Sequence, residues 1–186
     1  MSGAGDEQAP GGGRYRAETA RWNPFVRSLG GARVLSALKL PFFLVRPPGA
    51  FGVLTTTGRK SGKARRKCVR VIRSGNEAYL VSIGGADAAW VKNVRANPAV
   101  RLRLRGGSMA GTVRELRDSA ERDRARKAYC ETISPFDYLM CAMHRNGRPT
   151  RTKIVELVRS WFATGTPLVV ELRAPAPRRP VARIAR

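Results

Sequence analysis

Five cationic side chains lie within eight consecutive residues of the segment TTTGRKSGKARR, residues 55–66. The cations are Arg59, Lys60, Lys63, Arg65 and Arg66. Gly58 and Gly62 allow a tight turn in which backbone N–H groups converge, and Ser61 adds a hydroxyl. Such donors bind phosphate or carboxylate oxygens. Three interpretations stay open on these residues alone: a solvated turn, a nucleic-acid grip and a cradle for a small anionic molecule.

The segment TGRKSGKA partly matches the phosphate-binding loop of nucleotide hydrolases, but it departs from that pattern. Its two glycines are one residue too close, and Ala64 occupies the position of the magnesium-binding hydroxyl residue. A strand, rather than the required helix, is expected to follow. The sequence therefore excludes a P-loop, although the donors of an anion site remain.

The whole chain is strongly basic, which favours anionic partners. Its 186 residues include 36 Lys and Arg against 13 Asp and Glu, and the formal net charge is +23. This charge predicts affinity for polyanions, acidic lipid headgroups or an anionic ligand, and composition does not choose among them. A specific nucleic-acid platform on Arg101, Arg103 and Arg105 is disfavoured, because aromatic side chains do not alternate with these arginines.

The cysteines Cys68, Cys130 and Cys141 indicate neither a disulfide framework nor a zinc site, since their number is odd and CxxC spacing is absent. They fit a reducing cytosol, and we expect no metal. The opening MSGAGDEQAPGGG lacks the pattern of a secretory signal. The longest apolar stretch, LSALKLPFFLV, is too short to span a bilayer. We therefore expect a cytoplasmic protein.

Strands must flank the basic turn, and alternating apolar residues predict them. Strands are expected at residues 51–57, 66–73, 77–83, 99–105, 108–116 and 167–173. The first three form a meander, and the fourth alternates arginines with valine and leucine. Because these strands follow one another with little helix between them, an antiparallel sheet or barrel is predicted.

Helices are expected before, between and after these strands. They are predicted within residues 14–39, between Asp87 and Pro98, after a capping box of Asp118 with Glu121, and around residues 150–162. The predicted fold class is mainly β with helical additions. Residues 1–13 are expected to be a disordered lead-in, 14–173 a single domain, and 174–186 a flexible basic tail.

Four motifs occur in an order that resembles a known family. They are LTTTGRKSG at Leu54 to Gly62, Gly84-Gly85, Trp90 with Asn93, and Asn97-Pro98 before the alternating strand. This ordered set resembles the deazaflavin-dependent nitroreductase family, whose split β-barrels, of the FMN/F420-binding type, bind coenzyme F420. The resemblance covers about residues 51–116 and the final strand, and it implies a split β-barrel.

The resemblance also assigns roles, because F420 carries a phosphate and a tail of glutamates. It implies that the phosphate and tail are held by Arg59, Lys60, Ser61 and Arg65. It implies that the deazaflavin is lined by Ser82, Gly84, Gly85, Trp90 and Asn93. The candidate catalytic residues are Ser82 and Tyr138, the latter as a proton donor on the substrate side. For Trp90 and Tyr138, purely structural roles stay open.

The implied reaction is hydride transfer from reduced F420 to an electron-poor small molecule, such as a quinone, an enone or a nitro compound. A non-catalytic F420 carrier and a basic nucleic-acid-binding protein stay open as alternatives. A homodimer is compatible with the sequence. The helix-prone region that includes Phe42 and Phe43 can lie on an anionic membrane surface or pack across the barrel.

Overall fold

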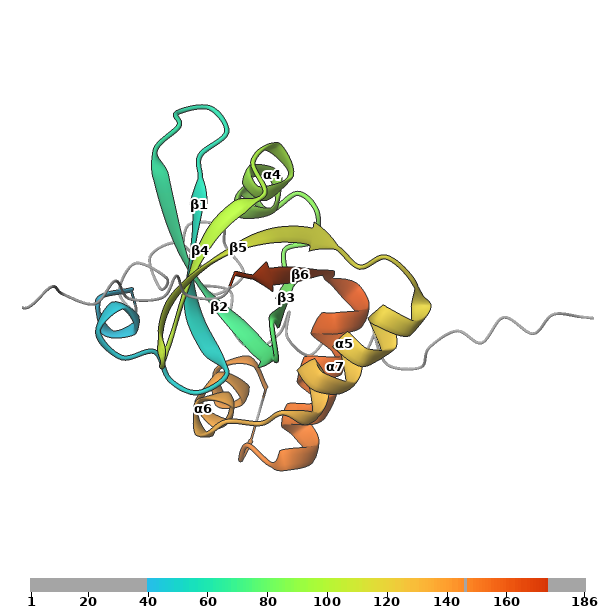
Figure 1. Cartoon of the computed structure of the whole chain (residues 1–186). Coiled ribbons are helices and arrows are strands. Elements are labelled where there is room, and N and C mark those ends of the chain that lie inside the picture. The colour runs from blue at the N-terminus through green and yellow to red at the C-terminus, as the bar shows by residue number, and fades with distance from the viewer. Residues whose placement is uncertain (1–39, 146, 174–186) are drawn as a thin grey trace, which may run out of the picture.

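The computed structural model describes residues 40–145 and 147–173 of the chain (Figure 1). A short helix at residues 40–45 leads into the first strand. The lead-in, the basic tail and the helices expected within residues 14–39 lie outside the described residues. Within the described part, each helix is too short or too polar to cross a bilayer.

Six antiparallel strands close into a barrel in the order β1-β2-β3-β6-β5-β4. They are β1 (Phe51–Thr57), β2 (Ala64–Ser74), β3 (Glu77–Ser82), β4 (Ala99–Leu104), β5 (Gly107–Glu115) and β6 (Thr166–Leu172). β1 pairs with both β2 and β4, and β6 completes the barrel between β3 and β5. The prediction of a mainly β barrel with helical additions is confirmed.

Side-chain alternation separates the inside of the barrel from its outer surface. On β4, Val100 and Leu102 are buried whereas Arg101 is exposed, as the period of two predicts. Leu54 on β1 belongs to the same interior core. Gly111 allows β5 and β6 to approach, since a Cβ there would lie 2.7 Å from the backbone oxygen of Glu171. Close packing of small and apolar residues therefore fixes the barrel.

Four labelled helices accompany the barrel: α4 (Ala89–Ala96), α5 (Ser119–Glu131), α6 (Pro135–His144) and α7 (Arg151–Thr164). α4 lies beside the end of the barrel from which the β1–β2 hairpin extends, and α5, α6 and α7 gather at the other side (Figure 1). Their shared core includes Tyr129, Ile154, Trp161 and Phe162. α4, α5 and α7 confirm predicted helices, although α4 begins after Ala88 without a side-chain cap.

Helix α6 is not among the helices predicted from the sequence, although its start carries a recognisable signature. Ser134 and Asp137 form a capping box, with Pro135 in the first turn. Asp87 lies just before α4, as expected, and its carboxylate pairs with Lys92 at 2.8 Å on the surface rather than capping the helix.

Arg70 on β2 joins the barrel to α5 and α6. Its guanidinium donates to the backbone oxygens of Tyr129 and Thr132 at 2.7 and 2.5 Å, and to Oδ1 of Asp137 at 2.8 Å. The charged side chains of Arg70 and Asp137 are only 3% and 2% exposed. Oδ2 of Asp137 accepts from the backbone N–H and the hydroxyl of Ser134. The buried charges are therefore compensated and hydrogen-bonded.

Arg114 on β5 forms a second ionic cluster, which ties the start of α5 to the barrel. It pairs with Glu121 and with Glu171, each at 2.6 Å. The hydrogen bond from Arg114 is the main reason that the pKa of buried Glu121 is lowered from 4.5 to about 2. The predicted capping box is half formed, because Asp118 accepts from the Glu121 N–H while the Glu121 carboxylate bonds to Arg114 and the Arg117 N–H.

Removing the carboxylate of Asp137 should strongly destabilise the fold, because Arg70 would remain buried without its counter-ion. We expect Asp137→Ala to lower the free energy of unfolding by about 3–5 kcal/mol in urea denaturation. The matched control is Asp123→Ala, which breaks an exposed pair with Arg126 on α5. We expect the control to change stability by less than about 0.5 kcal/mol. Equal losses of unfolding free energy in the two variants would contradict a structural role for the buried Arg70–Asp137 ion pair.

Glu121 should make stability pH-dependent in acid. Because its pKa is depressed in the folded state, its ionised form stabilises the fold above about pH 4.5, and this contribution disappears as the pH falls towards 2. We expect Glu121→Gln to be less stable near neutral pH and to lose less additional stability than the parent at about pH 3. Glu131→Gln, at an exposed position of the same helix, is the control and should keep the parental pH dependence. If Glu121→Gln kept the parental pH dependence of stability, Glu121 could not be the source of that dependence.

Candidate functional site

The basic segment forms the loop of the β1–β2 hairpin, which extends beyond the body of the barrel (Figure 1). The Gly58 N–H donates to the Lys63 oxygen at 2.9 Å, and the Gly62 N–H donates to the Gly58 oxygen at 2.8 Å. Gly62 has a φ of 64°, which favours glycine. A Cβ at Gly58 would lie 3.0 Å from Oγ of Ser61. The two glycines therefore permit the tight turn that the sequence predicts.

The backbone of this turn offers few free donors. Three of its N–H groups bond to the loop's own carbonyls, and a fourth bonds to the hydroxyl of Ser61. The Arg59 N–H donates to Oδ1 of Asn93 at 3.2 Å. Between residues 58 and 63, Lys60 alone keeps an N–H without a partner among the described residues. The expected convergence of backbone donors is thus largely absent, and the free donors of the loop are mainly on its side chains.

Among the described residues, the exposed cations of the hairpin lack acidic partners. Within the described ranges, no carboxylate lies within 4.0 Å of Arg59, Lys60, Lys63, Arg65 or Arg66. Arginines elsewhere do pair, as Arg95 does with Glu115 at 2.7 Å. Several uncompensated cations on one hairpin create a positive potential that favours an anionic ligand.

Asn93 on α4 holds the β1–β2 loop in place through hydrogen bonds. Its Oδ1 accepts from the backbone N–H of Arg59 and, at 3.4 Å, from Nη1 of the same residue. Its Nδ2 donates to the hydroxyl of Thr56 at 3.3 Å, and both side chains are buried. The structure thus gives Asn93 a positioning role that the sequence does not show. Thr56 is likewise not predictable from the sequence, because nothing distinguishes it from its neighbours Thr55 and Thr57.

A tight turn at the end of β3 leads into α4. The Gly85 N–H donates to the Ser82 oxygen at 3.0 Å, and the Ser82 hydroxyl donates to the Gly85 oxygen at 2.9 Å. Ser82 is buried, and Gly85 has a φ of 68°. Gly84 is exposed in the same turn, and Trp90 on α4 is half-buried against the barrel core. The residues predicted to hold the cofactor therefore lie on three adjoining segments: the β1–β2 loop, the β3–α4 turn and α4.

Tyr138 lies far from these three segments in the same chain. It is exposed on α6, whose Phe136 ring packs against Phe51 at a centroid distance of 4.8 Å. Phe51 begins β1, whereas the basic loop follows Thr57 at its other end. At about 3.3 Å per residue, the length of β1 separates the two ends by roughly 20 Å. The proton-donor role of Tyr138 stays a prediction.

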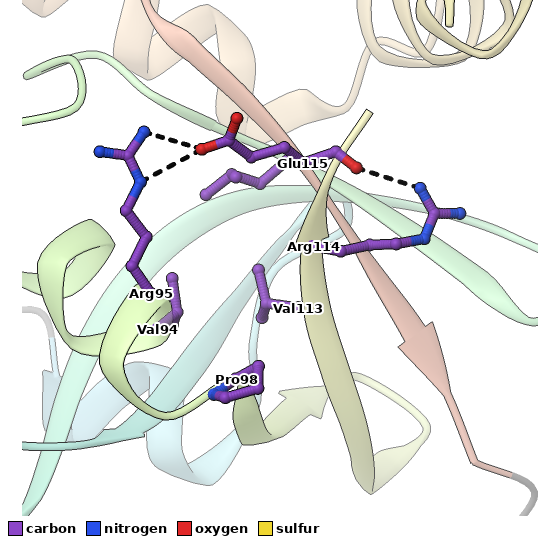
Figure 2. Close-up of a pocket in the computed structure, with 7 residues that line it drawn as sticks. Val94, Arg95, Pro98, Val113, Arg114 and Glu115 are labelled. Atoms are coloured by element: carbon purple, nitrogen blue, oxygen red, sulfur yellow. Dashed lines mark hydrogen bonds and ion pairs between the residues drawn. The ribbon is translucent and has the colours of Figure 1, made fainter. Parts of the chain in front are cut away.

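Two surface hollows are lined by residues other than those predicted to bind the cofactor. One, of about 160 Å³, lies between the end of α4 and strands β5 and β6, and Figure 2 shows the Arg95–Glu115 pair at its rim. The other, of about 460 Å³, is lined by β2, β3 and α5. The predicted cofactor residues line neither hollow. Their cations project from the surface of the hairpin instead.

The donor set fits a cofactor with an extended anionic part. Guanidinium, ammonium and hydroxyl groups of Arg59, Lys60, Arg65 and Ser61 can make charge-assisted hydrogen bonds to phosphate and carboxylate oxygens. The half-buried Trp90 provides an apolar surface close to the same loop. The three cysteines form no disulfide among the described residues, and no group of His, Cys, Asp or Glu among the described side chains is placed to hold a metal ion. The residues present therefore fit F420.

Comparison with known proteins points to the same cofactor. Residues 45–146 match the family described as F420H(2)-dependent quinone reductase. The structure of an F420-H2 dependent reductase (FDR-A) is 25% identical, covers 66% of this chain and 95% of its own, and has a TM-score of 0.44. An F420 reductase is 18% identical, with coverages of 72% and 92% and a TM-score of 0.39. A domain-swapped dimer is 23% identical, with coverages of 67% and 81% and a TM-score of 0.44.

These TM-scores are all below 0.5, so the assignment depends on the family match, which spans more than half of the chain. The match includes the basic loop, the β3–α4 turn and α4, and it confirms the resemblance drawn from the sequence motifs. The chain belongs to the F420H2-dependent quinone reductase family.

Proposed function

We propose that this F420H2-dependent enzyme transfers a hydride to an electron-poor small molecule such as a quinone, an enone or a nitro compound. Membership of the family establishes the dependence on F420H2, and the substrate class is the proposal. The observation that supports the position of the cofactor is a hairpin whose cations have no carboxylate partner among the described residues, and in which a buried asparagine of α4 holds the Arg59 backbone.

The anionic part of the cofactor is assigned to the hairpin. Arg59, Lys60 and Arg65 would bind phosphate and carboxylate oxygens, and Ser61 would donate a hydroxyl. Asn93 holds the Arg59 backbone in place, so less loop ordering remains to be done when the cofactor binds. Long flexible cations on a fixed backbone suit a ligand whose charges are spread along a chain.

The ring of the cofactor is assigned to the surface formed by Trp90 and the β3–α4 turn. Ser82 fixes this turn through its bond to Gly85, and Ile83 exposes an apolar side chain there. When bound, reduced F420 supplies the hydride, and the protein needs neither a metal nor a covalent nucleophile. The residues of the turn then orient the ring and shield one face of it from water.

Location and assembly belong to the same proposal. We propose a cytoplasmic protein, because three cysteines that form no disulfide among the described residues suit a reducing compartment. A homodimer and peripheral contact with an anionic membrane stay predictions. We assign no specific nucleic-acid partner.

The double substitution Arg59→Ala/Lys60→Ala tests whether these hairpin cations bind the anionic part of the cofactor. Each lost charge-assisted hydrogen bond contributes on the order of 1.5–3 kcal/mol, so we expect F420 affinity to fall by at least about tenfold. Fluorescence titration with F420 measures the affinity, and thermal unfolding checks that the fold is retained. Stability should change by no more than about 0.5 kcal/mol, because both side chains are exposed.

The control is Arg122→Ala/Arg159→Ala, which removes the same charge from exposed positions of α5 and α7. This variant should keep the parental affinity at moderate salt. If both double variants bind F420 as the parent does, the hairpin is a solvated turn. Oxidation of F420H2 by a quinone, measured with the parent, separates a reductase from a carrier that binds without turnover.

Asn93→Ala should weaken F420 binding while every cation of the loop remains. The substitution removes the acceptor of the Arg59 N–H and the donor to Thr56, so the loop loses its fixed position. We expect a fall in affinity of about tenfold and a loss of stability of about 1–3 kcal/mol. Titration and urea denaturation measure the two effects. Faster hydrogen exchange of the Arg59 N–H would show directly that the loop is released, and unchanged exchange would argue against this positioning role.

A further inference from the structure

The larger of the two surface hollows, of about 460 Å³, lies between strands β2 and β3 and helix α5. Its volume is within the range of small-molecule sites in proteins. Ser74, at its edge, ends β2, whereas the basic loop precedes Ala64 at the other end of that strand. The 11 residues of β2 separate these ends by roughly 30 Å along the strand, and α5 lies on the side of the barrel away from the hairpin (Figure 1). The hollow is therefore separate from the proposed cofactor site.

Helix α5 lines the hollow with residues at three- and four-residue intervals, which place them on one side of the helix: Arg124, Lys127, Ala128 and Glu131. From the barrel, Tyr79 of β3 lines the same hollow. Tyr79 is buried, and its hydroxyl donates to Oε2 of Glu77 at 2.7 Å. Tyr79 therefore offers the hollow mainly the apolar surface of its ring.

The polar groups around this ring include cations and hydroxyls that the fold does not use. Within residues 40–145 and 147–173, neither Arg124 nor Lys127 has a carboxylate within 4.0 Å. The hydroxyls of Ser74 and Thr132, which also line the hollow, make no hydrogen bond to any described residue. Two cations and two hydroxyls in one hollow are the donors that bind a phosphate group and its neighbours.

Glu131 limits which anions fit the hollow. It has no cationic partner among the described side chains, and its carboxylate repels an anionic group placed beside it. Arg124 and Glu131 are seven residues apart, which is about 10 Å along the helix. An anionic group near Arg124 therefore avoids Glu131, which accepts hydrogen bonds from uncharged hydroxyls instead. This arrangement matches a ligand with a charged group at one end and hydroxyls at the other.

We propose that this hollow binds a sugar phosphate. The phosphate lies between Arg124 and Lys127, and the hydroxyls of the sugar bond to Glu131, Ser74 and Thr132. This inference goes beyond the proposed function and does not depend on it, because the site uses none of the residues assigned to the cofactor. It gives the reductase a second, metabolite-binding site, whose occupation stabilises the folded chain by mass action.

Calorimetric titration of the full chain at physiological salt tests the inference, with ribose-5-phosphate and glucose-6-phosphate as probes and inorganic phosphate and ribose as comparisons. At least one sugar phosphate should bind at least about fivefold more tightly than inorganic phosphate, and ribose should bind more weakly than either. The same sugar phosphate should raise the melting temperature. If neither sugar phosphate binds more tightly than inorganic phosphate, the inference is overturned.

Two variants locate the binding. Arg124→Gln/Lys127→Gln should weaken sugar phosphate binding at least about tenfold, because it removes two charge-assisted hydrogen bonds to the phosphate. Glu131→Ala should bind inorganic phosphate at least as well as the parent, since it removes a repulsive charge, and its preference for the sugar phosphate should fall at least about threefold. Thermal unfolding verifies that both variants are folded. Parental affinities in both variants would overturn the inference.

The matched control is Arg122→Gln/Arg159→Gln, which removes the same charge from exposed positions of α5 and α7 outside the hollow. It should bind the sugar phosphate within about twofold of the parent. An equal loss in this control would show that net charge is responsible and would overturn the inference. Arg59→Ala/Lys60→Ala should also keep the parental affinity for the sugar phosphate, whatever it does to F420 binding. A loss there would place the sugar phosphate on the hairpin and would likewise overturn the inference.

Discussion

A shortage of carboxylates is the constraint on which this structure depends. With 13 acidic against 36 basic residues, most cations must remain without a counter-ion. Two of the acidic residues pair with cations that would otherwise be buried or crowded without a counter-ion. Asp137 pairs with Arg70, and Glu121 pairs with Arg114. These pairs hold the helices against the barrel. The β1–β2 hairpin receives no acid among the described residues, so its charge remains available to an anionic cofactor.

Charge alone would not make a binding site, because a mobile loop loses much of its binding energy to ordering. Here the position of the loop derives from the core. α4 is anchored by Val91 and Val94, which pack into the barrel interior, and the same helix presents Asn93 to the loop. A single buried amide thus links hydrophobic packing to the placement of Arg59. The β3–α4 turn, fixed by Ser82, enters the same helix, so the two segments to which we assign the cofactor share one support.

The strands could be predicted because side-chain alternation is a local property, and β1 was expected with the bounds that the structure shows. α6 is harder to predict, since several of its sides are apolar: Phe136 packs towards helix 40–45, and Cys141 lies in the core shared with α7. The family motifs located the candidate site, but they do not show which polar groups the fold already uses. Asn93 and Ser82 are both buried and bonded, and only the three-dimensional arrangement reveals this.

We infer that the hairpin cations, which have no carboxylate partner among the described residues, select an extended, highly charged cofactor. A competition titration between F420 and FMN in one buffer tests it most directly, because a single phosphate would leave several of these cations without partners. We expect F420 to bind at least about tenfold more tightly than FMN, and added salt to reduce this difference in affinity by screening the exposed charges. FMN binding more tightly than F420, or a preference unaffected by salt, would contradict it.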